Sequence, residues 1–176
     1  MKKILERDVL KAQLDVLRNR GGKIAFTNGC FDILHVGHVR YLQEAKKTAD
    51  VLVLALNSDS SVRSIKGEKR PLVPEKERAE VLAALECVDF VTIFRELTPL
   101  ELICYLKPDI LIKGGDWPED KVVGRDEIRQ WGGHVAIIPE VAGKSTTNIV
   151  EKIISAYGSE IEVPGPSAGF PQNVKT

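Results

Sequence analysis

Two unbroken apolar runs constrain the fold of this chain most strongly. Residues 51–56 read Val-Leu-Val-Leu-Ala-Leu, with no polar residue at alternate positions. Such a run is typical of a central strand in a parallel sheet that is covered on both faces. The run Lys23-Ile24-Ala25-Phe26 predicts a second buried strand, which Gly29 breaks.

Stretches with helical periodicity alternate with strands along the chain. Further strands are predicted at residues 89–94, 109–113 and 135–138, and helices at residues 3–20, residues 36–47, from Pro74, from Thr98 and after Asn148. Residues 119–131 are expected to be partly helical, and the last helix is expected to bury Ile149, Val150, Ile153 and Ile154. This alternation predicts an α/β fold with a doubly wound, Rossmann-like parallel sheet in a single domain.

Length and composition set the domain organisation. The 176 residues, 43% of them hydrophobic, suffice for one substantial core. We expect residues 1–22 to form a covering helix ended by Gly21-Gly22, and residues 23–157 to form the α/β domain. Residues 158–176 are rich in Gly, Pro and Ser and lack apolar periodicity, so we expect a disordered tail.

Charge and cysteine content exclude several classes of protein. Lys plus Arg equals Asp plus Glu at 25 each, so no overall basic field favours nucleic acid or a membrane surface. Cys30, Cys87 and Cys104 are odd in number and form no Cys-x-x-Cys pair, which argues against a disulfide framework and a structural zinc site. Since no signal segment and no bilayer-length apolar run is present, we expect a cytoplasmic protein.

Two histidines stand where the first strand meets the next helix. His35 and His38 are three residues apart at the helix start, so both imidazoles can face the same way beside exposed backbone N–H groups. Such a helix end with two imidazoles suits anionic oxygen. Gly37 leaves room for a ligand to approach the backbone. We interpret the stretch from Thr27 to His38 as a nucleotide phosphate site.

Other kinds of site are less compatible with the sequence. His35 and His38 could bind a transition metal, but no third ligand stands at helical spacing, and Cys30 alone does not complete a tetrahedral set. Gly143-Lys144-Ser145 is similar to part of a P-loop, yet the Walker pattern requires glycine where Ile138 stands. No Gly-x-Gly-x-x-Gly follows any strand, which disfavours a dinucleotide site.

Three distant segments are expected to meet at one edge of the sheet. The His pair, Asp116 and residues 145–147 all follow the carboxyl ends of predicted strands, where open α/β sheets bind ligands. Residues 64–74 form a basic, irregular stretch that we expect to be a mobile loop.

The motifs together resemble a known family. Gly29-x-Phe31-Asp32, His35-Val36-Gly37-His38, Glu77-Arg78 and Ser145-Thr146-Thr147 are similar to the motifs of nucleotidyltransferases that include cytidylyltransferases and pantetheine-phosphate adenylyltransferase. The resemblance covers residues 23–156 in the same order. Thr27–Asp32, Asn57-Ser58-Asp59, Lys113–Asp116 and Ser145–Ile149 look most like the adenylyltransferase module of bacterial ADP-heptose synthesis. Residues 23–157 would then be the nucleotidyltransferase domain.

The resemblance implies an adenylyltransferase that moves AMP from ATP to a sugar 1-phosphate, D-glycero-D-manno-heptose 1-phosphate. His35 and His38 would hold α- and β-phosphate oxygens, so that positioning and charge stabilisation supply the catalysis. Lys66 would close over the triphosphate from the basic loop, with Lys69 or Arg70 as alternatives, and Arg78 would be a second clamp.

The resemblance also implies binding residues and partners. The expected set is Asn28, Gly29, Phe31, Asp32, Gly37, Asn57, Asp59, Gly115, Asp116, Ser145, Thr146 and Thr147. Within it, residues 145–147 would meet the β- and γ-phosphates, Asp116 the base, and Asn28 and Asn57 the sugar phosphate. Asp32 would orient a histidine, approach Mg²⁺ or merely close a turn. Mg²⁺ is expected to arrive with ATP and not in a protein cage, and a homodimer is expected by analogy.

Two other functions remain open on the sequence. One keeps the chemistry and changes the substrates, as in a cytidylyltransferase that acts on glycerol phosphate. The other is a nucleotide-binding module without turnover. The fold does not separate them, because unrelated functions share it.

Overall fold

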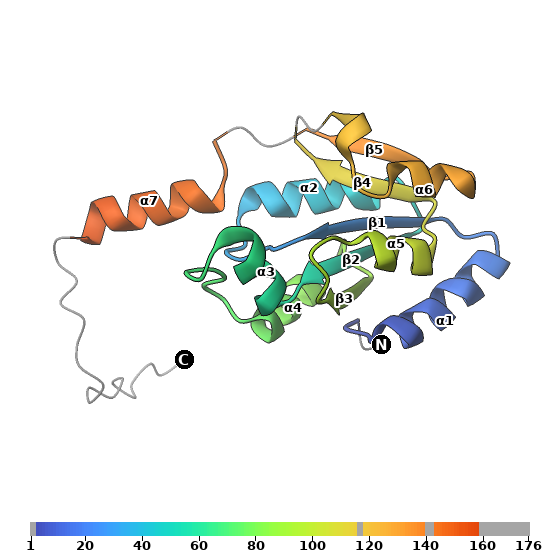
Figure 1. Ribbon diagram of the computed structural model, residues 1–176, viewed down its shortest axis with the longest axis horizontal. Coiled ribbons are helices and arrows are strands. Elements are labelled where there is room, and N and C mark those ends of the chain that lie inside the picture. Colours follow the sequence, from blue (N-terminus) through green and yellow to red (C-terminus); the bar gives the residue numbers. More distant parts are fainter. Residues whose placement is uncertain (1–2, 116–117, 140–142, 159–176) are drawn as a thin grey trace. The chain divides into compact units, whose positions relative to one another are not determined.

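A computed structural model of the chain describes residues 3–115, 118–139 and 143–158. Its centre is a five-stranded, fully parallel sheet in the order β3-β2-β1-β4-β5 (Figure 1). The strands are β1 (Ile24–Gly29), β2 (Val51–Asn57), β3 (Phe90–Phe94), β4 (Ile110–Gly114) and β5 (His134–Ile138). The predicted doubly wound α/β fold is therefore confirmed.

Helices cover both faces of this sheet. They are α1 (Arg7–Asn19), α2 (Val36–Lys46), α3 (Asp59–Lys66), α4 (Glu75–Ala84), α5 (Leu100–Leu106), the 3-10 turn η1 (Glu119–Lys121) and α6 (Arg125–Gln130). A last helix, α7 (Thr146–Tyr157), follows them in the chain and is described separately below. Side chains of α1, α5 and α6 share one apolar cluster with the sheet, and side chains of α2 and α4 share another. Burial of apolar area on both faces is the main driving force for this layered arrangement.

Alternate residues of the central strand serve the two layers. Ile24 and Phe26 of β1 belong to the cluster under α1 and α5, whereas Ala25 belongs to the cluster under α2 and α4. All three side chains are fully buried. This two-sided burial explains why the apolar runs in the sequence lack alternation.

The N-terminal segment differs from its prediction at the start. The covering helix begins at Arg7, while Ile4 forms a parallel bridge with Val91 at the edge of β3. Leu10 and Leu14 are buried, whereas Val9 is 51% exposed. The backbone of residues 3–5 finds hydrogen-bond partners on β3 that a helix would not give it.

An unpredicted short helix, α3, follows β2. Ser58 is its N-cap, and the side-chain oxygen accepts a hydrogen bond from the backbone N–H of Ser61 at 3.2 Å. Asp59 in the first turn and Lys66 in the last turn suit the helix dipole. Lys66 therefore ends a helix, and the basic loop begins only at Gly67.

The chain divides into two compact units, Met1–Thr146 and Thr147–Thr176. The first holds the sheet and its helices. The described part of the second is α7, which confirms the predicted last helix but has no buried residue, with Ile153 and Ile154 47% and 62% exposed. A single helix cannot cover its own apolar stripe, so the predicted burial of this side stays a prediction. Apart from Gly158, the expected disordered tail lies outside the described residues.

The strand order fixes where a ligand can bind. The chain runs from β1 outward through β2 to β3, and then returns to the other side of β1 for β4 and β5. The carboxyl ends of β1 and β4 therefore flank a topological switch point, where open α/β sheets form a crevice.

Candidate active site

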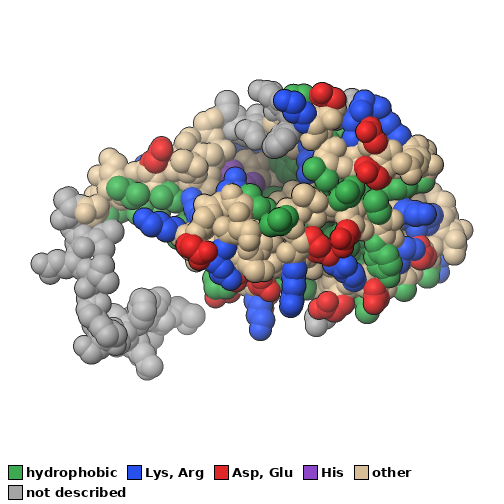
Figure 2. Space-filling view, viewed as in Figure 1, with side chains coloured by type: hydrophobic (Ala, Val, Ile, Leu, Met, Phe, Trp, Pro, Cys, Tyr) green, Lys and Arg blue, Asp and Glu red, His purple; other side chains and the backbone are tan. Residues whose placement is uncertain are grey.

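A cavity of about 440 Å³ opens at this switch point. Figure 2 shows histidine side chains (purple) at the bottom of a hollow. The cavity is lined by Asn28, Gly29, Cys30, Phe31, His35, Gly37, His38, Tyr41, Lys113, Gly114, Lys121, Val122, Val123, Lys144, Ser145 and Thr146. The structure thus brings together the predicted residues from β1, from the start of α2 and from residues 145–146.

The two histidines form a stacked pair at the start of α2. Their ring centroids are 3.8 Å apart and the rings are inclined by 21°. His35 is the N-cap residue, and the edge of Phe31 approaches His38 at 5.1 Å between centroids. The Nδ1 atoms of both rings are buried, and neither has a hydrogen-bond partner among the described residues. Each ring can therefore meet a ligand only through Nε2.

Burial keeps both imidazoles neutral at pH 7. Desolvation lowers the pKa of His35 below its usual 6.5. The pKa of His38 is lowered to about 4, mainly by burial and also by the neighbouring His35. A neutral imidazole carries one N–H donor, so each ring can give one hydrogen bond to an anionic oxygen without adding a charge of its own.

Gly37 is required here for a reason that the sequence did not suggest. A Cβ atom at this position would lie 2.9 Å from Cε1 and Nδ1 of the His35 ring, and 3.1 Å from Cβ of Lys144. The space expected for a ligand is filled by the protein's own imidazole. Gly37 allows the ring of His35 to lie against the helix backbone.

Phe31 has a strained backbone and supports the histidine pair from one side. Its φ of +43° lies in the left-handed region, which costs a residue other than glycine about 1–3 kcal/mol. The ring is buried and lies so close to Gly29 that a Cβ there would be 2.9 Å from it. This turn directs the chain from β1 towards His35.

Asp32 anchors the basic loop to the site. One carboxylate oxygen accepts a hydrogen bond from Nη1 of Arg70 at 2.6 Å, and the other accepts backbone N–H groups of Leu72 and Val73 at 2.7 and 2.9 Å. Both oxygens are thus occupied within the protein. These contacts favour the turn-closing alternative, and they engage Arg70, which the sequence offered as a substitute for Lys66.

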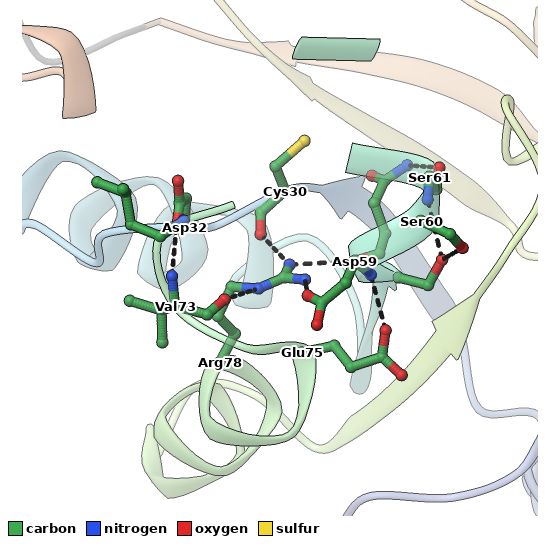
Figure 3. A network of polar contacts seen from close by, with 11 residues as sticks. Cys30, Asp32, Asp59, Ser60, Ser61, Val73, Glu75 and Arg78 are labelled. Atoms are coloured by element: carbon green, nitrogen blue, oxygen red, sulfur yellow. Dashed lines mark hydrogen bonds and ion pairs between the residues drawn. The ribbon is translucent and has the colours of Figure 1, made fainter. Parts of the chain in front are cut away.

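Arg78 belongs to a buried network outside the cavity (Figure 3). Its guanidinium donates to the carbonyl oxygens of Cys30, Asn57 and Val73, and it pairs with the Asp59 carboxylate at 2.7 Å. The side chain is fully buried. The structure therefore does not bring Arg78 to the cavity. Instead, Arg78 joins the ends of β1 and β2 to α3 and α4.

Four other predicted residues do not line the cavity. Asn57 and Asp59 belong to the Arg78 network, and the Asn57 side chain donates to Oγ of Ser61. Lys66 is exposed, and its charge opposes the rise that burial causes in the pKa of the cavity residue Cys30. Gly115 is buried beside the site and donates its N–H to Ile138, at 3.0 Å.

At the cavity, Oγ1 of Thr146 donates to the carbonyl of Ile33 over 3.4 Å. Thr147 belongs to the second compact unit, and Asp116 lies outside the described residues.

Several lining residues were not predicted as site residues from the sequence. Lys113, Lys121 and Lys144 add three cations to the cavity, and Tyr41 forms a 2.6 Å hydrogen bond with Thr27. Burial raises the pKa of Tyr41 to about 12. A signal for Lys113 was present, because a lysine directly after an apolar strand run lies at the edge where ligands bind.

No group of three or more His, Cys, Asp or Glu residues able to hold a metal ion occurs in the part of the chain that the structure describes. In the same part, no helix is long and apolar enough to span a membrane.

Comparisons with known proteins identify relatives of this chain. Two relatives named "Bifunctional protein HldE", from Geobacter metallireducens and Pelobacter propionicus, are 58% and 57% identical over 158 and 155 residues. These alignments cover 90% and 88% of this chain but only 32% of each relative, so the chain spans about a third of the length of the curated relatives it matches.

A solved structure also matches. It is the lipopolysaccharide core biosynthesis protein from Thermoplasma volcanium, with a TM-score of 0.58 and 32% identity over 69% of this chain and 98% of that one. The cytidylyltransferase-like family model matches residues 26–157, which contain most of β1, the other four strands, the histidine pair and the residues that line the cavity. The chain therefore belongs to the cytidylyltransferase-like family, as its motifs predicted.

Proposed function

We propose that this chain is an adenylyltransferase that moves AMP from ATP to D-glycero-D-manno-heptose 1-phosphate. The products would be ADP-heptose and pyrophosphate. The observation that carries the proposal is the stacked, neutral histidine pair in the switch-point cavity. The resemblance of the motifs to the ADP-heptose adenylyltransferase module supports the choice of substrates, as do a lipopolysaccharide core biosynthesis protein and HldE among the similar proteins.

The reaction is an in-line displacement at phosphorus. A phosphate oxygen of the sugar 1-phosphate forms a bond to the α-phosphorus of ATP, and the bond from that phosphorus to the bridging α,β oxygen breaks. Pyrophosphate leaves with the electron pair. A phosphate monoester is already a competent nucleophile, so positioning and charge stabilisation carry the catalysis.

His35 and His38 would donate their Nε2–H hydrogens to oxygens of the α- and β-phosphates. Because both rings are held by stacking and by Phe31, these donors need no reorganisation when negative charge moves to the leaving group. Ser145, Thr146 and Thr147 would receive the β- and γ-phosphates, with Lys66 closing from the end of α3. Asn28 and Asn57 would serve the sugar phosphate, and Gly115 with Asp116 the base.

Two predicted residues fit another role better. The buried contacts of Arg78 support positioning of the exit of β1, and those of Asp32 support positioning of the basic loop.

Mg²⁺ fits the site as an ion bound mainly by the phosphates of ATP, because the described residues offer no carboxylate cage and Asp32 is fully engaged. When bound, it would neutralise charge on the pyrophosphate. We expect the reaction to take place in the cytoplasm, where ATP is available. The homodimer remains a prediction, which light scattering can test.

Pyrophosphate release tests the proposed function directly. The protein, ATP, Mg²⁺ and heptose 1-phosphate should release pyrophosphate, and an equimolar mixture of ATP and CTP should yield the ADP-sugar. CDP products, with glycerol phosphate as the better acceptor, would instead indicate the cytidylyltransferase alternative. Tight ATP binding without turnover on a panel of acceptors and all four nucleotides would indicate a binding module.

His38→Ala should reduce turnover about 10²–10³-fold, as expected for the loss of a transition-state hydrogen-bond donor. His134→Ala is the matched control, because His134 is exposed on β5, and this variant should retain turnover. Equal turnover in both variants would contradict the role given to His38.

A further inference from the structure

We propose that Lys113, held in position by Asn28, is the cation that receives a substrate phosphate in this cavity. The proposal rests on the proposed function for the identity of the substrates, which carry the phosphate either on the nucleotide or on the sugar.

The sheet topology brings this pair together. Asn28 and Lys113 are each the next-to-last residue of a strand, in β1 and β4, which are neighbours and parallel. The Lys113 ammonium donates a hydrogen bond to Oδ1 of Asn28, and both residues line the cavity with His38. The ammonium group is therefore fixed within the same cavity as the imidazole pair.

The charge of Lys113 has no counter-ion in the described structure. The described lining of the cavity holds three lysines and no carboxylate, and the one hydrogen-bond partner found for Lys113 among the described residues is a neutral amide. Removing an ammonium group from water without an opposite charge is costly. An arriving phosphate would supply the missing charge and make a charge-assisted hydrogen bond.

The state of Lys113 fits this role. Burial lowers its pKa to about 8, so the side chain is still mainly protonated at pH 7. A lysine that only packs would extend its ammonium group to the surface along an apolar stem. Lys113 instead directs the charged end to Asn28, so the protein maintains a partly buried positive charge at the site.

Calorimetric titration tests the proposal without relying on turnover. ATP and heptose 1-phosphate are titrated separately into the wild type, Lys113→Met, Lys113→Arg and Asn28→Asp. Lys113→Met should raise the Kd of one ligand about 10–100-fold. Asn28→Asp should weaken the same ligand although Lys113 is intact, because the new carboxylate competes with phosphate. Lys113→Arg should restore most of the affinity.

The matched control is Lys47→Met, which removes an exposed lysine at the far end of α2 and should leave both affinities unchanged. Thermal melting checks folding. Lys113→Met should melt at the same or a higher temperature than the wild type, because it removes a desolvated charge.

Proton uptake gives a readout that a purely structural role would not change. At pH 8 a bound phosphate raises the pKa of Lys113, so the wild type should take up protons on binding and Lys113→Met should not. The other titratable groups that line the cavity are His35, His38, Cys30, Tyr41, Lys121 and Lys144. At pH 8 both histidines are neutral, and burial holds the pKa values of Cys30 and Tyr41 above their usual ranges.

The outcomes separate this proposal from the proposed function. A change in the Kd of ATP assigns Lys113 to the nucleotide, and a change for heptose 1-phosphate assigns it to the acceptor. Unchanged affinity for both ligands in Lys113→Met overturns the role of Lys113, even if pyrophosphate release is intact. A wild type that binds both ligands without turnover overturns only the proposed function. A wild type that binds neither ligand overturns both.

Discussion

At the scale of single residues, the site depends on the absence of a side chain at Gly37 as well as on the two histidines. Gly37 has no side chain, and the imidazole of His35 occupies the space that a Cβ would take. That contact holds His35 parallel to His38 and leaves Nε2 of each ring for the ligand. The geometry of the histidine pair therefore depends on Gly37, one of the two residues between them.

Gly37→Ala should impair turnover while preserving the fold. The added Cβ would lie 2.9 Å from the His35 ring, so the ring has to leave the stack, whereas alanine favours a helix by about 1 kcal/mol over glycine. We expect at least a tenfold loss of turnover, unchanged or higher thermal stability, and a rise in the pKa of His38 by NMR.

The control is Gln43→Ala, at an exposed position on the same helix, which should change none of these quantities. An unperturbed His38 signal in Gly37→Ala would contradict this explanation.

The sequence was enough to single out these histidines as candidate site residues, but not to predict their contacts. The spacing of His35 and His38 predicted a shared direction, and the structure shows a stacked pair. Lys113 was missed as a site residue because a lysine after an apolar run also marks an ordinary strand end. Only the neighbouring β1, which is 85 residues distant at Asn28, shows that its charge turns inward.

At the scale of elements, Arg78 connects parts of the chain that the sequence treats as separate. The strands were predictable because apolar runs and their breaks are local signals. Helix α3 was missed because its eight residues contain only two apolar side chains, Val62 and Ile65. The Arg78 network joins this helix to β1, β2 and α4, and no local pattern encodes such long-range contacts.

Arg78→Met should destabilise the protein by about 3–5 kcal/mol, because it leaves the Asp59 carboxylate and three carbonyl oxygens without their donor. Urea unfolding measures this loss. The exposed Arg20→Met serves as the control and should change the free energy of unfolding by less than about 0.5 kcal/mol. If Arg78→Met instead weakened ATP binding at unchanged stability, the clamp predicted from the sequence would be correct.

At the scale of the whole molecule, the histidine pair makes stability depend on pH. The pKa of His38 is about 4 in the folded protein and near 6.5 when unfolded. Between these values the unfolded chain binds more protons, so the free energy of unfolding falls as pH falls from 6.5 to 4.5. Allowing for partial exposure of the ring, we expect a loss of about 1–2 kcal/mol.

His38→Gln should flatten this dependence. Urea unfolding at pH 7.0, 5.5 and 4.5 measures the slope for the wild type, for His38→Gln and for His134→Gln, an exposed histidine outside the cavity. The wild type and His134→Gln should lose stability in parallel, and His38→Gln should lose less. Parallel slopes for all three would show that His38 does not titrate with folding.

The central position of β1 has a consequence for local unfolding. This strand is hydrogen-bonded to β2 along its whole length and to β4 on its other side, and it ends in Asn28 and Gly29 at the cavity. We expect its amide hydrogens to exchange with solvent mainly when the sheet opens as a whole. The β1 side of the cavity and the core would then open in the same event, so a bound phosphate should slow exchange throughout the sheet and not merely in a surface loop.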